Sequence, residues 1–321
     1  MNLRDTTVAA LTRLEPAKAT EKLLGLVEGN LAALSAQVEE VAKAPPLERS
    51  FRIISSVLPC YTHPVAGPRY AEPALRHLVE TGLTNIGARA RAAGIRLSMH
   101  PGQFCVLATD NEAVLANSIE ELDYHTEVMR LLGLTGGWHP QGAHINIHGG
   151  AKGPGVEAFA RGFARLQEDA RNLLTVENDE VSYGLDDLLP LAERLPVVLD
   201  LHHHWCKSGG EHIATGDPRI ALVRESWRGT RPVGHLSAPR EDLLPGGLDP
   251  DTMPDFQALV AAGVSTRDLR KHSDRMWNRA INRWAVGHLG WADLEVEAKA
   301  KNLASHDLAQ AVSAEARAAA E

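Results

Sequence analysis

Histidines and carboxylates stand at the ends of short apolar segments along most of this chain. The segments read SMH, NIH, TVE, VVLD, VGHL and EVE, and they supply His100, His148, Glu177, Asp200, His235 and Glu297. Imidazole nitrogens and carboxylate oxygens together suit Mn, Zn or Fe, and several of each predict more than one ion. A single residue of this kind is more often a loop hydrogen-bonder than a ligand. The complete set predicts a metal enzyme.

The elements that must position these side chains alternate between strands and helices. Seven strands are predicted, at 51–55, 95–100, 143–148, 173–177, 196–201, 231–236 and 292–297. Such alternation favours a parallel sheet, and one long series without a linker favours a single TIM-barrel-like α/β domain over residues 1–321. Because the parallel strands of a barrel all end on one face, side chains from most of the sequence can meet there.

One strand of a complete eight-stranded barrel is missing from this pattern, and it is the first. Residues 1–50 read as a helical segment, dominated by an amphipathic helix at 16–44. The segment TTVAAL at 6–11 is only a poor strand candidate. Further along, we expect an insertion on the active face at 242–271 and an Ala-rich C-terminal helix at 302–321.

Side-chain alternation within a strand predicts which residues share a face. It places Glu295 on the same face as Glu297. It also pairs Asp200 with His202, which conflicts with a ligand at His203 unless the chain bends on leaving the strand. A strand end is where such a bend is expected.

Composition limits the class of protein. The 321 residues are 44% hydrophobic and 23% charged, as in a globular chain, and carry a formal net charge of -8. No apolar run approaches the ~20 residues of a membrane helix, and the polar N-terminus is unlike a secretory signal, so we expect a cytoplasmic protein without membrane contact. The acidic balance argues against coating nucleic acid through bulk charge, although a formal count omits bound divalent cations.

Six motifs, in this order, resemble the UV damage endonuclease family. They are MHPGQF (99–104), VENDE (176–180), LDLHHH (199–204), GHLS (234–237), HSD (272–274) and EAKAK (297–301). The resemblance runs from the first long helix to about residue 301. It implies a TIM barrel holding a cluster of divalent ions, typically manganese, in an enzyme that incises duplex DNA immediately 5′ of pyrimidine dimers and other distorting lesions.

The resemblance also assigns residues. The implied metal ligands are His63, His100, His148, Glu177, Asp200, His203, His235, His272 and Glu297. Glu177, Asp200, His235 and Glu297 would form the catalytic inner shell around the attacking water and the scissile phosphate. Adjacent ions suit this chemistry because they lower the pKa of the water and clamp the phosphate oxygens. We expect two or three ions, most simply Mn, with Zn or Mg as alternatives.

Other residues are expected to contact the DNA. Gln103 and Phe104 match the pair that members of that family insert into the helix at the lesion, where unstacking costs only a few kcal/mol. Ordinary loop packing is the alternative for Phe104. Arg240, Lys299 and Lys301 are candidate phosphate contacts, and solvated surface charge is the alternative for each. The expected partner is damaged double-stranded DNA, bound by a monomer.

Two departures from the resemblance concern the site. Val233 stands two residues before His235, where the family usually has a lysine that can be carboxylated and bridge metals. The family's first strand, with an aromatic residue that probes damage, is absent ahead of NLRDTT. Either the natural start lies further upstream, or this is a divergent member. The alternative functions are another metal-dependent enzyme on a xylose-isomerase-like barrel and a catalytically impaired relative.

Overall fold

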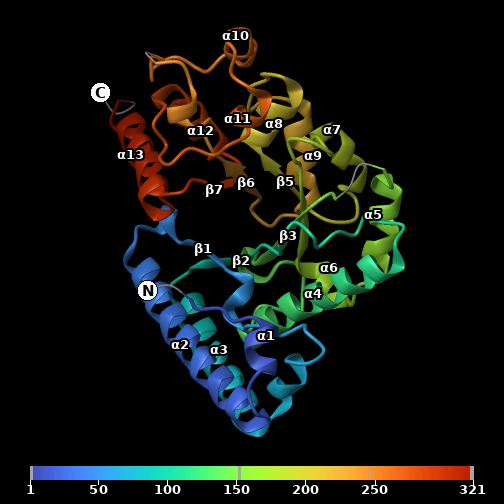
Figure 1. Ribbon diagram of the computed structural model, residues 1–321. Coiled ribbons are helices and arrows are strands. Elements are labelled where there is room, and N and C mark those ends of the chain that lie inside the picture. Colours follow the sequence, from blue (N-terminus) through green and yellow to red (C-terminus); the bar gives the residue numbers. More distant parts are fainter. Residues whose placement is uncertain (1–2, 151–152, 247, 319–321) are drawn as a thin grey trace. The chain divides into compact units, whose positions relative to one another are not determined.

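The computed structural model describes residues 3–150, 153–246 and 248–318. These residues form an α/β chain in which parallel strands alternate with helices (Figure 1). The chain divides into two compact units, which we describe separately. Unit 1 comprises Met1–Ile147 and Ala160–Leu174, and unit 2 comprises His148–Phe159 and Thr175–Glu321.

All seven predicted strands are present among the described residues, each within two residues of its predicted bounds. They are β1 (Ser50–Ile53), β2 (Arg96–Met99), β3 (His144–His148), β4 (Leu174–Glu177), β5 (Val197–Asp200), β6 (Val233–Leu236) and β7 (Asp293–Val296). The long helix α2 (Pro16–Lys43) precedes the first of them, also as predicted. The strand order and connections are those of a TIM-barrel-like chain with one strand fewer than eight.

Unit 1 contains β1, β2 and β3, which pair as parallel neighbours in that order. Its helices are α1 (Val8–Thr12), α2, α3 (Pro73–Ala92), α4 (Glu112–Leu131) and α6 (Glu168–Leu173), with short 3-10 helices η1 (Pro46–Glu48), η2 (Ser55–Val57), η3 (Gly67–Ala71) and η4 (Pro140–Gly142). Helix α2 packs mainly on α3 and turns its apolar stripe, including Leu23, Val27 and Leu34, into the core.

The weak strand candidate at 6–11 is wrong, because residues from Val8 onward form helix α1. The side chain of Thr7 accepts a hydrogen bond from the Ala10 amide and so caps this helix. Alanines at positions 9 and 10 have high helix propensity, which outweighs the β preference of Val8.

Unit 2 contains β4, β5, β6 and β7, again parallel neighbours in chain order. Its helices are α7 (Leu185–Leu188), α8 (Leu201–Ser208), α9 (Pro218–Ser226), α10 (Phe256–Ala261), α11 (Thr266–Leu269), α12 (Arg279–His288) and α13 (Asn302–Ala318), with η5 (Leu189–Leu191) and η6 (Glu241–Leu243). Helix α5 (Gly155–Ala164) spans the boundary of the units in sequence. No helix in the described ranges is long and apolar enough to cross a membrane.

Two apolar clusters support the strands of unit 2. Val198 of β5 and Val233 of β6 pack with Trp227, which is fully buried and donates its indole hydrogen bond to the Val197 carbonyl over 3.0 Å. The other cluster joins α8 to α10 and α11 and contains Trp205, Cys206, Phe256, Leu259 and Leu269. Val198 and Val233 lie two residues before Asp200 and His235, and Trp205 and Cys206 follow His203 in helix α8. Close packing of the two clusters therefore restrains the segments that carry these site residues.

Candidate metal centre

Two carboxylates lie at neighbouring strand ends in unit 2. Glu177 is the last residue of β4 and Asp200 the last residue of β5, and both side chains are completely buried. The two strands pair in parallel, with Val176 opposite Val197 and Glu177 opposite Val198. Because parallel strands end at the same edge of a sheet, this pairing brings the two carboxylates to one place.

The chain bends directly after Asp200, as predicted. Asp200 is the N-cap of helix α8, and its Oδ1 accepts a hydrogen bond from the His203 amide over 2.6 Å. The first turn of this helix swings His203 back over the strand end. Its Nδ1 lies 3.2 Å from Glu177 Oε1 and 3.6 Å from Asp200 Oδ2. The strand-to-helix switch therefore removes the conflict over His203.

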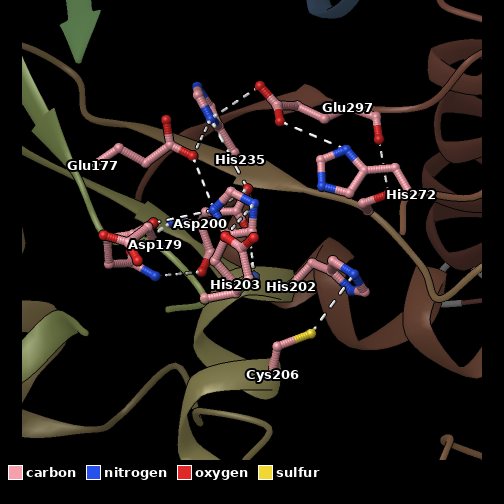
Figure 2. Close-up of polar contacts among 12 residues, drawn as sticks. Glu177, Asp179, Asp200, His202, His203, Cys206, His235, His272 and Glu297 are labelled. Carbon is pink, nitrogen blue, oxygen red and sulfur yellow. Dashed lines mark hydrogen bonds and ion pairs between the residues drawn. The ribbon is translucent and has the colours of Figure 1, made fainter. Parts of the chain in front are cut away.

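His235 and Glu297 come to the same place from β6 and the end of β7. His235 stands opposite Asp200 in the sheet, and its Nδ1 lies 3.1 Å from Glu177 Oε1 and 3.3 Å from Glu297 Oε1. Figure 2 shows its ring between the two glutamates. The Glu297 amide donates to the Leu236 carbonyl over 2.8 Å, which extends the β6–β7 pairing to this residue.

His272 reaches the site from the long excursion between β6 and β7. The backbone holds it there, because Pro239 and His272 form an antiparallel bridge and the Ser273 amide donates to the Ala238 carbonyl over 3.0 Å. The Lys299 amide in turn donates to the Ser273 carbonyl over 3.1 Å. His272 Nδ1 consequently lies 3.7 Å from Glu297 Oε2 (Figure 2).

These side chains form two groups within unit 2 that could each hold a cation. One group is Glu177, Asp200, His235 and Glu297; the other is His203, His272 and Glu297, and the ligand atoms within each lie within 4.8 Å of one another. Glu297 belongs to both groups. In the first group Asp200 Oδ2 is buried and accepts no hydrogen bond from the described residues. A buried carboxylate oxygen in that state is costly unless a cation binds it, so the donor set fits divalent metal ions.

Electrostatics in the cluster favour bound positive charge. Burial, together with the carboxylates of Glu177 and Glu297, raises the pKa of Asp200 against an opposing effect of His203. Burial lowers the pKa of His203, but the neighbouring Asp200 and Glu177 outweigh it and hold that pKa well above its ordinary value. The site thus stabilises a positive charge on the His203 imidazole. A bound metal ion would supply that positive charge instead.

Neighbouring histidines have different surroundings. His148, at the end of β3, belongs to unit 2, and its ring centroid lies 5.9 Å from that of His203. His202 is buried beside Cys206, with 3.8 Å between Nε2 and Sγ, and its ring meets that of His272 edge to face at 5.4 Å. Burial, and then His272, lower the pKa of His202. His202 is therefore a neutral packing partner of His272.

The predicted site residues of unit 1 lie on loops. His100 follows β2, and its Nδ1 lies 2.9 Å from the Pro101 carbonyl oxygen. His63 receives a hydrogen bond at Nδ1 from the Val65 amide over 3.1 Å and lines a groove of about 520 Å³ with Tyr61, Glu120 and Arg130. Gln103 is exposed, and Phe104 is 83% exposed. Loop packing of the Phe104 ring, the alternative considered from sequence, is therefore wrong.

The candidate phosphate contacts all lie near acidic or strained positions in unit 2. Arg240 forms an ion pair with Asp242. Lys299 Nζ lies 3.0 Å from Asp274 Oδ1, and both side chains are about half exposed. Lys301 has a positive φ of 52°. Arg240 and Lys299 would have to exchange these carboxylates for phosphate to contact DNA.

Three residues of unit 2 lie next to these groups but were not predicted as site residues. Asn178 accepts from the Asp200 amide over 2.9 Å and donates to the Asp200 carbonyl over 3.0 Å, and its own carbonyl oxygen lies 3.1 Å from His203 Nδ1. Glu180 Oε2 lies 3.7 Å from His203 Nε2, and Glu295 Oε2 lies 3.8 Å from His235 Nε2. Asn178 and Glu180 lie within VENDE, and side-chain alternation had placed Glu295 beside Glu297.

Comparisons with known proteins give a consistent result. A family model described as UV-endonuclease UvdE matches residues 1–318. A UV-damage endonuclease of Neurospora crassa is 32% identical over 241 residues, which cover 71% of this chain and 33% of that protein. One of Schizosaccharomyces pombe is 30% identical over 266 residues, which cover 80% of this chain and 39% of that protein. The matches therefore span less than half the length of these two relatives.

A solved structure is also similar. The crystal structure of SacUVDE matches with a TM-score of 0.71 and 25% sequence identity, and the match covers 97% of this chain and 91% of that chain. This likeness confirms the predicted TIM-barrel-like fold class with one strand missing.

Proposed function

The chain belongs to the UV-endonuclease UvdE family, and from this premise we propose that it is a metal-dependent endonuclease acting on UV-damaged DNA. The reaction would be hydrolysis of the phosphodiester 5′ to a pyrimidine dimer or another distorting lesion. The observation that carries the proposal is the pair of side-chain groups joined by Glu297. Adjacent sites for divalent cations suit phosphodiester hydrolysis, which needs both an activated water and neutralised phosphate charge.

The proposed ligands divide between the two groups. Glu177, Asp200 and His235 would hold one cation, His203 and His272 a second, and Glu297 would contribute to both. His148 is proposed as a further ligand, as are His100 and His63 of unit 1. Bound cations would supply Lewis acidity toward water and the phosphate oxygens. Mixed imidazole and carboxylate donors favour Mn, with Zn or Mg as alternatives.

The side chains divide their polar atoms between holding the fold and holding a cation. Asp200 uses Oδ1 for the cap of helix α8 and keeps Oδ2 directed to the cluster. Asn178 fixes the Asp200 backbone on both its amide and its carbonyl, so that Oδ2 has little freedom to turn away. Fixed ligands of this kind bind a cation without having to be ordered first.

Gln103 and Phe104 are proposed to probe the lesion. An 83% exposed phenylalanine loses its hydration on entering a base stack, and this transfer favours insertion. Insertion requires unstacking, which costs less where a lesion has already disrupted pairing. The pair would therefore select damaged sites without reading their sequence.

Val233 limits what this site can contain. Its side chain is fully buried against Val198 and Trp227, and it has no amine to carboxylate. Glu297 belongs to both groups and would be the protein ligand that the two cations share. We propose two cations in unit 2 for this reason, and metal analysis of the purified protein would measure their number.

The decisive experiment compares UV-irradiated with untreated supercoiled plasmid, each incubated with the protein in Mn²⁺ or in EDTA. We expect nicking of the irradiated plasmid in Mn²⁺ alone. Equal inactivity on both plasmids, with bound metal confirmed, would refute the proposal. Nicking of both plasmids to the same extent would refute damage selectivity.

A single variant tests the site itself. Glu177→Gln keeps the shape of a fully buried side chain and removes its charge, so nicking should fall below detection while the fold persists. The matched control is Glu193→Gln, which makes the same change at an exposed position of unit 2 and should leave nicking unchanged. Near-normal activity of Glu177→Gln would show that the site lies elsewhere.

A further inference from the structure

We propose that Arg270 binds a backbone phosphate of DNA beside the candidate metal centre. The inference rests on the proposed function, because it names a residue that would hold the DNA next to the place of hydrolysis. Arg270 stands two residues before His272, in the excursion between β6 and β7. It is not among the phosphate contacts expected from sequence, which were Arg240, Lys299 and Lys301.

The segment around Arg270 is basic, although the chain as a whole is acidic. Residues 267–283 contain six lysines or arginines and two aspartates, which give this segment a formal net charge of +4, against -8 for the whole chain. DNA carries a negative charge at every phosphate, so its binding depends on local positive charge. The segment that carries His272 therefore brings positive charge to the edge of the metal centre.

Arg270 differs from most cations of this segment because it is not already neutralised. Four of the six cations form ion pairs with aspartates, and these pairs are Lys271–Asp268, Arg275–Asp307, Arg279–Asp251 and Arg283–Asp251. The half-buried Arg270 side chain forms no ion pair or hydrogen bond with a described residue. Arg240 and Lys299 would first have to give up a carboxylate, whereas Arg270 can bind a phosphate directly.

The residues on both sides of Arg270 fix its place beside helix α8. Leu269 is completely buried in the cluster that joins α8 to α10 and α11, and its carbonyl oxygen accepts a hydrogen bond from the Cys206 thiol over 3.5 Å. On the other side, the His272 ring lies 5.5 Å from that of His203, measured between ring centroids. The backbone of Arg270 is therefore held at the edge of the metal centre.

The charge of Arg270 acts on helix α8. Burial raises the pKa of the Cys206 thiol, Asp200 and Glu180 add to this rise, and the positive charge of Arg270 opposes it. The guanidinium is therefore near enough to α8 for its charge to act there. This is the helix that Asp200 caps and that carries His203 in its first turn.

The chemistry of the side chain suits this role. The planar N–H groups of a guanidinium match two oxygens of one phosphate, which the single ammonium of a lysine cannot do. Such a contact carries no sequence information and instead fixes how the duplex lies on the protein. Arg270 would hold a neighbouring phosphate, so that the scissile phosphate stays at the carboxylate cluster.

Three variants separate a phosphate contact from bulk charge and from packing. Arg270→Gln removes the charge, and Arg270→Lys keeps the charge without the planar fork. Arg224→Gln is the matched control, because Arg224 is exposed and has no ion pair with a described residue. It lies in the last turn of α9, which leads to the start of β6, at the opposite edge of the sheet from the strand ends of the metal centre.

DNA affinity is measured by fluorescence anisotropy with a labelled duplex, either UV-irradiated or untreated. Each variant is combined with Glu177→Gln, so that bound DNA is not cleaved, and the MnCl₂ concentration is held constant while KCl is varied from about 50 to 200 mM. Circular dichroism and thermal melting check that each protein is folded.

We expect the slope of log affinity against log salt to become shallower by about 1 in Arg270→Gln, equally on both duplexes, with a loss of about 5- to 10-fold in affinity near 0.1 M salt. Arg270→Lys should keep the slope and lose less affinity, and Arg224→Gln should keep both. With Glu177 intact, Arg270→Gln should raise the KM for irradiated plasmid more than it lowers kcat.

An unchanged salt slope in folded Arg270→Gln would overturn the inference, as would an equal change in Arg224→Gln, which would show that bulk charge decides. A protein that binds neither duplex would overturn both this inference and the proposed function. Failure of the proposed function alone has a different signature. In that case the salt slope still depends on Arg270, but the wild type nicks no irradiated plasmid in Mn²⁺.

Discussion

The two units of this chain hold their candidate site residues in opposite surroundings. In unit 2 Glu177 and Asp200 are completely buried and are fixed by strand register and backbone hydrogen bonds. In unit 1 Phe104 is 83% exposed on a loop, and His63 lines an open groove. Side chains that bind a cation do so more tightly when they are buried and rigid. Side chains that probe DNA must instead be exposed, so that they can contact it. The difference predicts that the two units respond differently to substitution, metal and pH.

The largest expected effect is that of Asp200→Asn. Asparagine caps a helix as well as aspartate does, so α8 should persist. The buried negative charge disappears, so nicking should fall by about 100-fold or more. Without metal, the protein should melt at a higher temperature, because the cost of burying the charge and the repulsion from Glu177 and Glu297 are removed and together outweigh the lost attraction to His203. Plasmid nicking and differential scanning calorimetry measure the two effects. A lower melting temperature without metal would contradict a net cost of the buried charge.

Metal addition should stabilise the strand ends of unit 2 most. At a free Mn²⁺ concentration of 100 times Kd, binding should raise the free energy of unfolding by about 2.7 kcal/mol. Hydrogen exchange should slow most at the ends of β4, β5 and β6, next to the proposed ligands. Asp200→Asn serves as the control and should show neither change. Equal protection of the exposed loop at Phe104 would remove the contrast between the units.

Acid should destabilise unit 1 through His125. Burial lowers the pKa of this residue to about 4. Its Nδ1 lies 2.7 Å from the Glu121 carbonyl oxygen, and its Nε2 lies 2.9 Å from Ser55 Oγ. The unfolded chain, with an ordinary pKa near 6.5, binds the proton first. The contribution of neutral His125 to the free energy of unfolding is therefore complete above pH 6.5 and is lost as pH falls toward about 4. From pH 7 to pH 5 this single group accounts for about 2 kcal/mol.

His125→Gln tests that assignment. The variant should be less stable at pH 7, because the fit of the ring is lost, but its loss of stability between pH 7 and pH 5 should be smaller than in the wild type. Urea denaturation at both values measures this. His203 of unit 2 is the opposite case, since its carboxylate neighbours raise its pKa. An unchanged pH dependence in His125→Gln would exclude His125 as the source.

The smallest effect on stability should come from Phe104→Ala. An exposed side chain contributes little to folding, so the free energy of unfolding should change by less than about 0.5 kcal/mol. Discrimination between irradiated and untreated plasmid should fall more than turnover does. A substantial loss of stability would show that Phe104 packs in solution. Full discrimination would reject its role as a probe.

Much of the arrangement could be predicted from sequence, because it depends on local periodicity. The seven strands and helix α2 follow from apolar repeats. The bend after Asp200 was expected because a regular strand would direct His203 away from the face that Asp200 occupies. The hydrogen bonds of Asn178 and the position of Glu295 beside Nε2 of His235 could not be predicted. They depend on the register between strands, which no single segment encodes.

The segment between η6 and His272 shows how this molecule can change without losing its site. His272 is fixed by main-chain hydrogen bonds around Ala238 and Ser273, and these do not depend on which side chains the preceding segment carries. Exposed positions of residues 244–270 can therefore be replaced in evolution while His272 stays where it is, whereas Phe256, Leu259 and Leu269 pack against helix α8 and must remain apolar. Such a segment is a natural place for related enzymes to diverge in the surfaces they present, and for a designer to graft a new one.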